Sequence, residues 1–529
     1  MTRRILAVLL VLLFVVIGCL PLLVMAGQSL VVHDHVSAEF YTTLLTSKRT
    51  WVLLEHSLAL ASITTLLALA VGVPVGLLLA KTDLPFRKTL GVLVALPLLI
   101  PPYITAVCWS HVLGREGLLA TWLGPGLAAQ TAAWLFGLPG CALVLWSAFL
   151  PIVMLLTMTF VRTINPSLEE AGTLVSGWFG VLSGITTPLI RPGIVLAAVL
   201  VFLLSLGEFS VPAFLRYDVF SVESFTQFSA FHDVAAATAA AVLLASITLL
   251  VFGLERLSGR RHAYQLRPAP DGAPPAVIAL GRFRIASLIL ISLLCGLVVL
   301  VPLLVLVIHS ASLTAYAEAF SRAGDSLLRS LWYAAIGSSL LTGFGFLLGY
   351  FIQRATLPFW QGLDFLTLVL FALPSTVLGI GLVSLWNRPA TAWIYATPII
   401  VVLGYLAQYL ALTSRITVST LAQIPPSMEE AAQIVGAGWV RRLSLILAPL
   451  ARHGLAATWL VGYIFCLRDT GVTMMVYPPG GDTLPVRIFT LMANGSSSLI
   501  AALCVLMVVT TAIPLGVLGV VVRPARDVS

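Results

Sequence analysis

The sequence predicts an all-α membrane protein with twelve transmembrane helices, arranged as two parallel six-helix repeats. Three observations lead to this fold class. Of the 529 residues, 59% are hydrophobic and 9% are charged, whereas soluble proteins carry about 25% charged residues. Twelve apolar runs approach the roughly 20 residues of a membrane helix. Short motifs of the first half also recur in the second. The composition excludes a soluble enzyme and a disordered chain.

Apolar runs locate the expected spans. The first run follows Arg3 and Arg4 and is longer than the apolar core of a secretory signal, which has about 7–15 residues. We therefore expect it to be a retained first span. The fifth and eleventh runs carry polar residues near one end. The twelve expected spans lie at 5–27, 55–80, 90–112, 137–161, 192–212, 234–254, 285–308, 328–352, 364–386, 393–414, 449–467 and 498–522.

The distribution of Lys and Arg predicts the orientation. With Arg3 and Arg4 inside, 20 of the 29 basic residues fall on the cytoplasmic side and 9 fall outside. Cytoplasmic loops carry such an excess, so both termini are expected in the cytoplasm. The net charge of +8 fits this bias and contact with anionic membrane lipids, and we expect no nucleic-acid partner.

A Pro- and Arg-rich segment separates the two halves. Residues 255–284 hold six arginines and four prolines, a composition typical of a linker. We therefore expect a first transmembrane domain over residues 1–254, a cytoplasmic linker over 255–284 and a second transmembrane domain over 285–529.

Short motifs repeat between the halves. Leu84-Pro85-Phe86 recurs at residues 357–359, an offset of 273, and Ala95-Leu96-Pro97 recurs at residues 372–374, an offset of 277. The best match joins residues 164–171 to residues 424–431, in the loops after the fourth and tenth spans. Because each repeat contains six spans, the halves share one membrane topology and are parallel repeats.

The matching loops begin with a Ser-x-Glu-Glu-Ala pattern. Ser167 with Glu170, and Ser427 with Glu430, fit capping boxes at the start of a helix, where the helix dipole favours negative charge. Small residues follow and predict a turn. The carboxylates either cap surface helices or mark a docking site. Because the pattern occurs twice, we favour docking to a partner with twofold symmetry.

The second loop, Glu430-Ala431-Ala432 followed by Gly436, resembles the EAA loop of permeases from binding-protein-dependent ABC importers. The first copy has Gly172 and Ser176 in place of the usual Ala and Gly. The resemblance covers nearly the whole chain, as two fused permease domains, and implies the type I ABC importer permease fold. It assigns eight residues to ATPase-coupling loops: Glu169, Glu170, Ala171, Gly177, Glu429, Glu430, Ala431 and Gly436.

Three further segments resemble ferric-iron permeases: residues 207–212, 468–473 and 486–492. This likeness implies the permease subunit of a ferric-iron importer in the bacterial inner membrane. It also implies two copies of an ABC ATPase subunit and a periplasmic binding protein that delivers the substrate. Permeases for thiamine, phosphonate or another small anion remain alternatives, because they are related.

The sequence predicts neither ATP hydrolysis nor a cofactor on this chain. P-loop ATPases bind phosphate with a glycine-rich loop that ends in Gly-Lys-Ser/Thr. The three lysines of this chain are Lys48, Lys81 and Lys88, and none of them belongs to such a motif. We expect no catalytic residues here, so ATPase activity must come from another chain.

Two acidic residues occupy equivalent positions near the outer ends of the fifth and eleventh spans. Glu208 and Asp469 are 261 residues apart, and ionisable groups at such depth are functional candidates. They either line the pathway or contact the binding protein, or they lie at the water interface beside Arg216 and Arg468. Three histidines at outward ends, His56, His111 and His309, are scattered along the sequence, so we expect no metal site.

Two other classes compete with the importer. A proton-coupled secondary transporter also has two sets of six spans, and Glu255–Arg261 faintly resembles a motif of that class. That motif belongs between the second and third spans, where this sequence lacks it. A membrane-embedded enzyme would need clustered His, Asp and Glu, such as HExxH, and none occurs.

Overall fold

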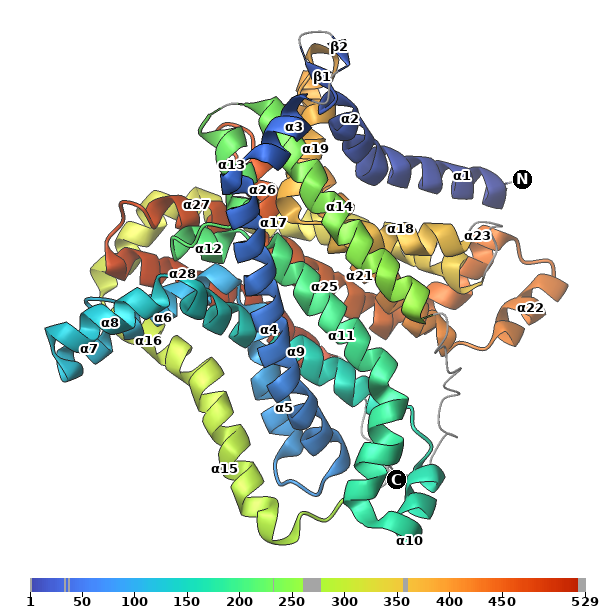
Figure 1. Cartoon of the computed structure of the whole chain (residues 1–529). Helices are drawn as coiled ribbons and strands as arrows, with labels where there is room; N and C mark the ends of the chain where they lie inside the picture. The colour runs from blue at the N-terminus through green and yellow to red at the C-terminus, as the bar shows by residue number, and fades with distance from the viewer. Residues whose placement is uncertain are drawn as a thin grey trace. The chain divides into compact units, whose positions relative to one another are not determined.

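The computed structural model describes residues 2–32, 35–36, 39–231, 233–259, 277–354 and 360–521. These residues are almost entirely helical, apart from a short antiparallel pairing of β1 (Val31–Val32) with β2 (His35–Val36). Nine helices in this part of the chain are long and apolar enough to cross a membrane, and three bent helix pairs raise the candidate spans to twelve. The all-helical membrane class is therefore confirmed, and every expected apolar run overlaps one of these helices or pairs (Figure 1).

The chain forms two compact units, which are not contiguous in sequence. The second unit comprises residues 48–223 and 246–309, and the first comprises residues 1–47, 224–245 and 310–529. The first expected span of each half thus belongs to the compact unit that contains most of the other half. The predicted boundary at residues 255–284 separates the two sequence repeats. The boundaries of the compact units do not coincide with it.

The second unit contains long helices joined by short ones. Its elements are α4 (Lys48–Lys81), α5 (Arg87–Ala95), η2 (Leu96–Leu99), α6 (Pro102–Leu113), α7 (Leu118–Leu123), α8 (Pro125–Leu135), α9 (Leu138–Val161), α10 (Pro166–Val181), η3 (Leu182–Thr186), α11 (Thr187–Gly207), α12 (Ser210–Phe214), η4 (Gly281–Phe283), α15 (Arg284–Cys295), η5 (Gly296–Leu300) and α16 (Val301–His309). The unit boundaries fall within α13 (Phe220–Ser229) and α14 (Val234–Gly259).

The first unit is built on α17, α21 and α25. Its elements are α1 (Thr2–Phe14), η1 (Val15–Cys19), α2 (Leu20–Gln28), β1, β2, α3 (Glu39–Thr46), α17 (Leu313–Gln353), α18 (Trp360–Ala372), α19 (Ser375–Trp386), η6 (Pro389–Thr391), α20 (Ala392–Tyr395), α21 (Ile399–Ala422), α22 (Pro426–Ile434), α23 (Trp439–Arg442), η7 (Leu443–Leu447), α24 (Ala448–Leu450), α25 (Arg452–Arg468), α26 (Gly471–Val476), α27 (Leu484–Leu491) and α28 (Ser497–Val521).

The same small-residue contact holds the core of each unit. A Cβ on Gly72 of α4 would lie 2.7 Å from Val153 Cβ of α9, and one on Gly345 of α17 would lie 2.6 Å from Thr413 Oγ1 of α21. Gly72 and Gly345 each open a Gly-x-x-x-Gly sequence, and such sequences allow membrane helices to approach closely. The two sequences are 273 residues apart.

Two spans that the sequence predicts as single helices are bent. The chain turns by 99° between the α5–η2 segment and the segment that begins with α6, and by 105° between α18 and α19. Pro101 and Pro374 are the N-caps of the second helix in these pairs, and proline removes a backbone donor there. The helices that follow begin at residues 102 and 375, an offset of 273, whereas the two Ala-Leu-Pro motifs are 277 residues apart.

Within the described ranges, four π-helical turns interrupt the helices. η1 and η5 lie in the first expected span of each half, and η3 and η7 follow the two paired loops. Single-turn π-helices occur frequently at functional sites. Their occurrence in matching pairs means that both halves have the same local distortion at the same two places.

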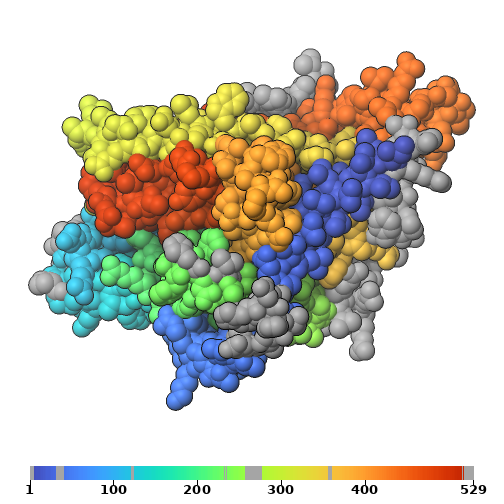
Figure 2. All heavy atoms as spheres, turned by 90° about the horizontal axis from the view of Figure 1, so that it is seen from above, coloured from blue at the N-terminus to red at the C-terminus, as the bar shows by residue number. Residues whose placement is uncertain are grey.

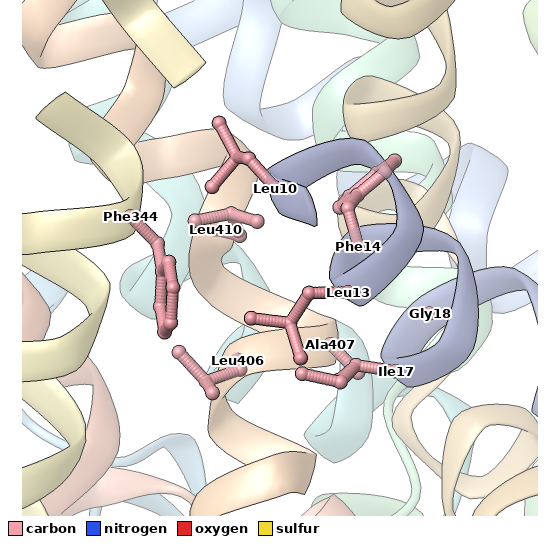
Figure 3. A pocket seen from close by; sticks show the side chains of 9 residues that line it. All are labelled: Leu10, Leu13, Phe14, Ile17, Gly18, Phe344, Leu406, Ala407 and Leu410. Carbon is pink, nitrogen blue, oxygen red and sulfur yellow. The ribbon is translucent and has the colours of Figure 1, made fainter. Parts of the chain in front are cut away.

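An apolar cleft separates the N-terminal helix from two helices of the first unit (Figure 3). Leu10 and Phe14 of α1 and Ile17 of η1 line one side, while Phe344 of α17 and Leu406 and Leu410 of α21 line the other. Hydrocarbon side chains on both sides suit a position inside a bilayer, where lipid tails are equally apolar.

Candidate functional site

The first paired loop is the helix α10 and its flanking turns. The Asn165 side chain caps this helix by accepting a hydrogen bond from the Ser167 backbone N–H at 3.1 Å. Ser167 Oγ also donates to Asn165 Oδ1 at 2.9 Å. The predicted capping box of Ser167 with Glu170 is therefore wrong, because the helix begins two residues earlier and Asn165 satisfies its end.

Glu169 points away from solvent and fastens this loop to the second span. Its carboxylate forms an ion pair with Lys81, the last residue of α4, and both side chains are at most 2% exposed. The other carboxylate oxygen accepts a hydrogen bond from Thr186 Oγ1 of η3 at 2.8 Å. A buried carboxylate requires such partners, because an isolated buried charge is very costly.

In the second loop, Glu429 likewise connects the loop helix to the second span of its half, through different partners. Tyr350 of α17 donates its phenol O–H to Glu429 Oε1 at 2.7 Å, and Arg354 Nε lies 3.4 Å from Glu429 Oε2. Pro425 is the N-cap of α22, without a side-chain hydrogen bond. The predicted capping box of Ser427 with Glu430 is therefore wrong too.

The two cations that hold these loops are equivalent in sequence. Lys81 precedes Leu84 by three residues and Arg354 precedes Leu357 by three residues, in the two copies of the Leu-Pro-Phe motif. The sequence alone did not predict that Lys81 or Arg354 belongs to the loop site. The spacing from this motif was the available signal, but the ion pairs join residues 88 and 75 positions apart and form only in the folded chain.

The remaining predicted loop residues face outward. Glu170, Ala171, Glu430 and Ala431 are all exposed. The first carboxylate of each Glu-Glu pair is thus turned towards the span, and the second is available to a partner. Figure 1 shows α10 and α22 at the ends of their respective helix groups, and the orange segment around α22 projects from the surface in Figure 2.

Large apolar side chains are exposed just before the glycine turn of each loop. Leu174 and Val175 are 89% and 88% exposed, and their counterparts Ile434 and Val435 are 86% and 83% exposed. Each pair lies next to a turn, outside the apolar runs expected to cross the membrane. Exposed apolar groups in adjacent positions mark interaction surfaces when they form a patch.

Each loop turns at a glycine with positive φ. Gly436 has φ +82° and follows α22. Its N–H donates to the Gln433 carbonyl and the Ala437 N–H donates to the Ala432 carbonyl, both at 3.0 Å, which is a Schellman motif. In the first loop the corresponding kink lies at Gly177, with φ +61° and ψ 176°, a backbone region that is essentially restricted to glycine.

Glu208 and Asp469 follow the last residues of α11 and α25. Glu208 Oε1 accepts a hydrogen bond from the Ser210 N–H at 3.0 Å. Asp469 is 5% exposed, and its carboxylate accepts from the Thr473 N–H at 2.8 Å and from the Tyr409 O–H at 2.7 Å. In both units an acidic side chain therefore satisfies backbone donors where a long helix breaks before a short one.

The structure brings together two of the histidines that are scattered in sequence. The rings of His111 and His309 stack with centroids 4.3 Å apart, whereas His56 stacks on Tyr217 with centroids 4.9 Å apart. Across the described ranges, no three His, Cys, Asp or Glu side chains lie close enough together to hold a metal ion.

Known proteins resemble this chain along most of its length, although no family model matches it. It is 27% identical over 416 residues to the putative ferric transport system permease protein FbpB 1 of Haemophilus influenzae, covering 74% of this chain and 65% of that protein. It is 22% identical over 523 residues to the Fe(3+)-transport system permease protein FbpB 2 of the same organism, covering 96% of both.

A shorter relative decides the family. The molybdenum transport system permease protein ModB of Azotobacter vinelandii is 37% identical over 172 residues, which are 30% of this chain and 72% of ModB. The chain belongs to the permease family of ABC importers. As a member of this family it is a permease, and its apolar helices are those of a multi-pass membrane protein.

Proposed function

We propose that this permease forms the translocation pathway of an ABC importer for ferric iron, and that its two loops receive the motion of separate ATPase subunits. The observation that carries the proposal is the pair of exposed apolar helix ends, Leu174–Val175 and Ile434–Val435. Each sits on a helix tied to a transmembrane segment by a carboxylate–cation pair. A surface that binds a moving partner needs both an exposed contact and a firm connection to the span.

Two ATPase subunits, one for each loop, fit this arrangement. Glu170 and Glu430 are exposed and would meet polar groups of those subunits, beside the apolar contact. Closure of the ATPases on ATP would move both loops and rock the two halves about a central pathway. Glu169, Ala171 and Gly177, with Glu429, Ala431 and Gly436, complete the proposed coupling loops.

The proposed architecture is twelve spans in two parallel six-helix repeats of the type I importer permease fold, over residues 1–254 and 285–529. Matching hydrogen bonds support the repeat. Ser57 Oγ accepts from the Phe220 N–H at 2.8 Å, and Ser330 Oγ, 273 residues later, accepts from the Leu484 N–H at 2.6 Å. The glycine pairs, the bends and the π-helical turns also recur.

The length of the matches favours ferric iron as the substrate. The two ferric relatives match 74% and 96% of this chain, whereas the molybdenum relative matches 30%. A permease for a small anion is the second candidate, and the higher identity of that shorter match supports it. A periplasmic binding protein would hold the substrate, and Glu208 and Asp469 would line the pathway or contact that protein.

Localisation follows from the same proposal. The permease would lie in the bacterial inner membrane, in contact with anionic lipids, with both termini in the cytoplasm as the Lys and Arg distribution predicts. The two coupling loops would then face the ATPase compartment.

Reconstitution tests the proposal. The permease would be placed in lipid vesicles with its proposed ATPase subunits and binding protein, and uptake of radioactive iron would be compared with uptake of molybdate. Iron uptake that requires both ATP and the binding protein supports the proposal. Uptake of molybdate instead of iron supports the second candidate, and uptake driven by a proton gradient without ATP contradicts both.

A further inference from the structure

Each coupling loop is held by an ion pair, called its anchor below: Lys81–Glu169 in the first loop and Arg354–Glu429 in the second. The two anchors are built alike but differ in burial. In both, the first carboxylate of the Glu-Glu pair meets a cation at the end of the second span of the same half. Lys81 and Glu169 are 2% and 1% exposed, whereas Arg354 and Glu429 are 13% and 12% exposed. The side chains of the second ion pair are therefore less deeply buried than those of the first, although Arg354 Nε itself is buried.

The hydroxyl that completes each anchor comes from a different direction. Thr186 lies in η3, directly after the loop helix, so Glu169 connects α4 to η3. Tyr350 lies in α17, on the same helix that leads to Arg354. The printed partners of Glu429 both come from α17 and its C-cap, whereas those of Glu169 come from α4 and η3. The first anchor therefore joins more elements than the second.

The end of the linker adds a further restraint to the first anchor. The Ile278 N–H donates to the Lys81 carbonyl at 2.7 Å, and the Asp83 N–H donates to the Ile278 carbonyl at 3.2 Å. The Leu280 N–H also donates to Asp83 Oδ1 at 3.0 Å. Residues 278–280 are thus hydrogen-bonded to the chain beside Lys81, although they belong to the segment that the sequence predicts as the linker.

We propose that Lys81 and Arg354 are positioning residues that transmit the displacement of each coupling loop to its own half, with the first connection the stiffer. The inference rests on the proposed function, because it assumes that an ATPase moves the loops. A carboxylate bound to the end of a span must move with that span. The fully buried, linker-supported pair allows less relative motion than the second pair, whose side chains are partly exposed.

This assignment predicts uncoupling rather than simple loss of activity. Glu169→Gln and Glu429→Gln keep the shape of each side chain and remove its charge. Without the ion pair, an ATPase can still move the loop and hydrolyse ATP, but the span no longer follows. Transport per ATP hydrolysed is therefore expected to fall more than tenfold in Glu169→Gln and by a smaller factor in Glu429→Gln.

The experiment uses the complete complex of permease, ATPase subunits and binding protein in lipid vesicles. Iron uptake and ATP hydrolysis are measured in the same preparation, and their ratio is compared between variants. Lys81→Arg and Arg354→Lys retain the charge and should retain most of the ratio. Glu318→Gln is the matched control, because it removes the 2.9 Å ion pair with Arg322 on the surface of α17 and touches neither loop.

Each outcome decides the question. A lowered ratio in the two glutamine variants, with the control unchanged, supports the positioning role. Variants that assemble and keep the wild-type ratio overturn it. If Glu169→Gln does not accumulate in the membrane, the test uses the less buried Arg354–Glu429 pair instead. The ratio of transport to ATP hydrolysis is then measured in Glu429→Gln and Arg354→Gln. A wild-type permease that never co-purifies with an ATPase subunit contradicts the proposed function itself, which is a different result from an unchanged ratio.

Discussion

Lys81 and Glu169 lie 88 residues apart in the sequence and form an ion pair that is almost completely buried. The pair joins the end of the second span to the first turn of the loop helix. Burying two charges is costly, and the cost is offset when they pair and when their remaining atoms find hydrogen bonds, as Glu169 does with Thr186. Removing one partner leaves the other charge buried without compensation.

Substitution of Lys81 should therefore destabilise the permease strongly. Lys81→Met leaves the Glu169 carboxylate buried without a cation, and breaking a buried pair in this way costs about 3–5 kcal/mol. Arg354→Met should cost less, because the Glu429 side chain is 12% exposed and that of Glu169 is 1% exposed. Thermal unfolding of both variants, purified in one detergent, measures the difference. Equal loss of stability would contradict the burial argument, and recovery in the double variant Lys81→Met/Glu169→Met would support it.

Apolar runs predicted where the candidate membrane helices and bent helix pairs lie, because bilayer thickness imposes a minimum length on every crossing helix. They did not predict the bends at Pro101 and Pro374, since a mean over 20 residues is insensitive to the direction of the chain. The capping boxes failed for a local reason. Asn165 and Pro425 precede the serines and already start the helices.

The sequence also could not predict which carboxylate of each Glu-Glu pair binds the cation. The repeated Glu-Glu pattern identified the loops, but it made the two carboxylates of a pair equivalent. The fold distinguishes them, since Glu169 is 1% exposed and Glu170 faces solvent. The helical position of each residue relative to the span decides this, and that geometry appears only when the loop packs against α4.

The isolated permease should hydrolyse no ATP. The sequence lacks a phosphate-binding loop, and Lys81, one of its three lysines, is buried in an ion pair with Glu169. Release of phosphate by the purified permease in lipid measures this directly, and addition of ATPase subunits provides the positive control. ATP turnover by the verified chain alone would show that the proposed division of labour is wrong.

The exposed apolar ends of the loop helices should determine ATPase binding. Leu174→Asp and Ile434→Asp place a charge where a partner expects an apolar contact, and both positions are more than 85% exposed, so folding should not suffer. The expected result is a clear loss of co-purifying ATPase at unchanged permease level. Leu313→Asp, which alters an equally exposed residue at the start of α17, is the control and should have no effect on ATPase binding.

Separation of the two halves tests the linker. The proposed cut, within residues 268–275, falls outside the described part of the chain, and we expect the two halves to co-purify when expressed together. Ile278→Pro should be more harmful than the cut, because proline removes the N–H that donates to the Lys81 carbonyl. Loss of that hydrogen bond costs about 1–3 kcal/mol.

Membrane level and thermal stability of the separated halves and of Ile278→Pro provide the readout. Ile278→Ala keeps the backbone N–H and is the control for the side chain. Halves that insert stably and never associate would refute the two-domain reading. An Ile278→Pro variant as stable as Ile278→Ala would show that the linker end does not restrain the first anchor.

The turns of the coupling loops give the last prediction. Gly436 and Gly177 have positive φ, whereas Ser176, which aligns with Gly436 in sequence, does not. No atom lies within 4 Å of a Cβ built on either glycine. Substitution by valine would thus act through backbone strain alone, on the order of 1–3 kcal/mol, and would shift the helix that docks. Gly436→Val and Gly177→Val should both impair transport and ATPase association, and Ser176→Val should have a smaller effect on both.

Membrane levels must be matched, so that lost folding is not mistaken for lost coupling. If Ser176→Val is as harmful as Gly436→Val, the backbone explanation fails, and if none of the three has an effect, these loops do not form the ATPase contact.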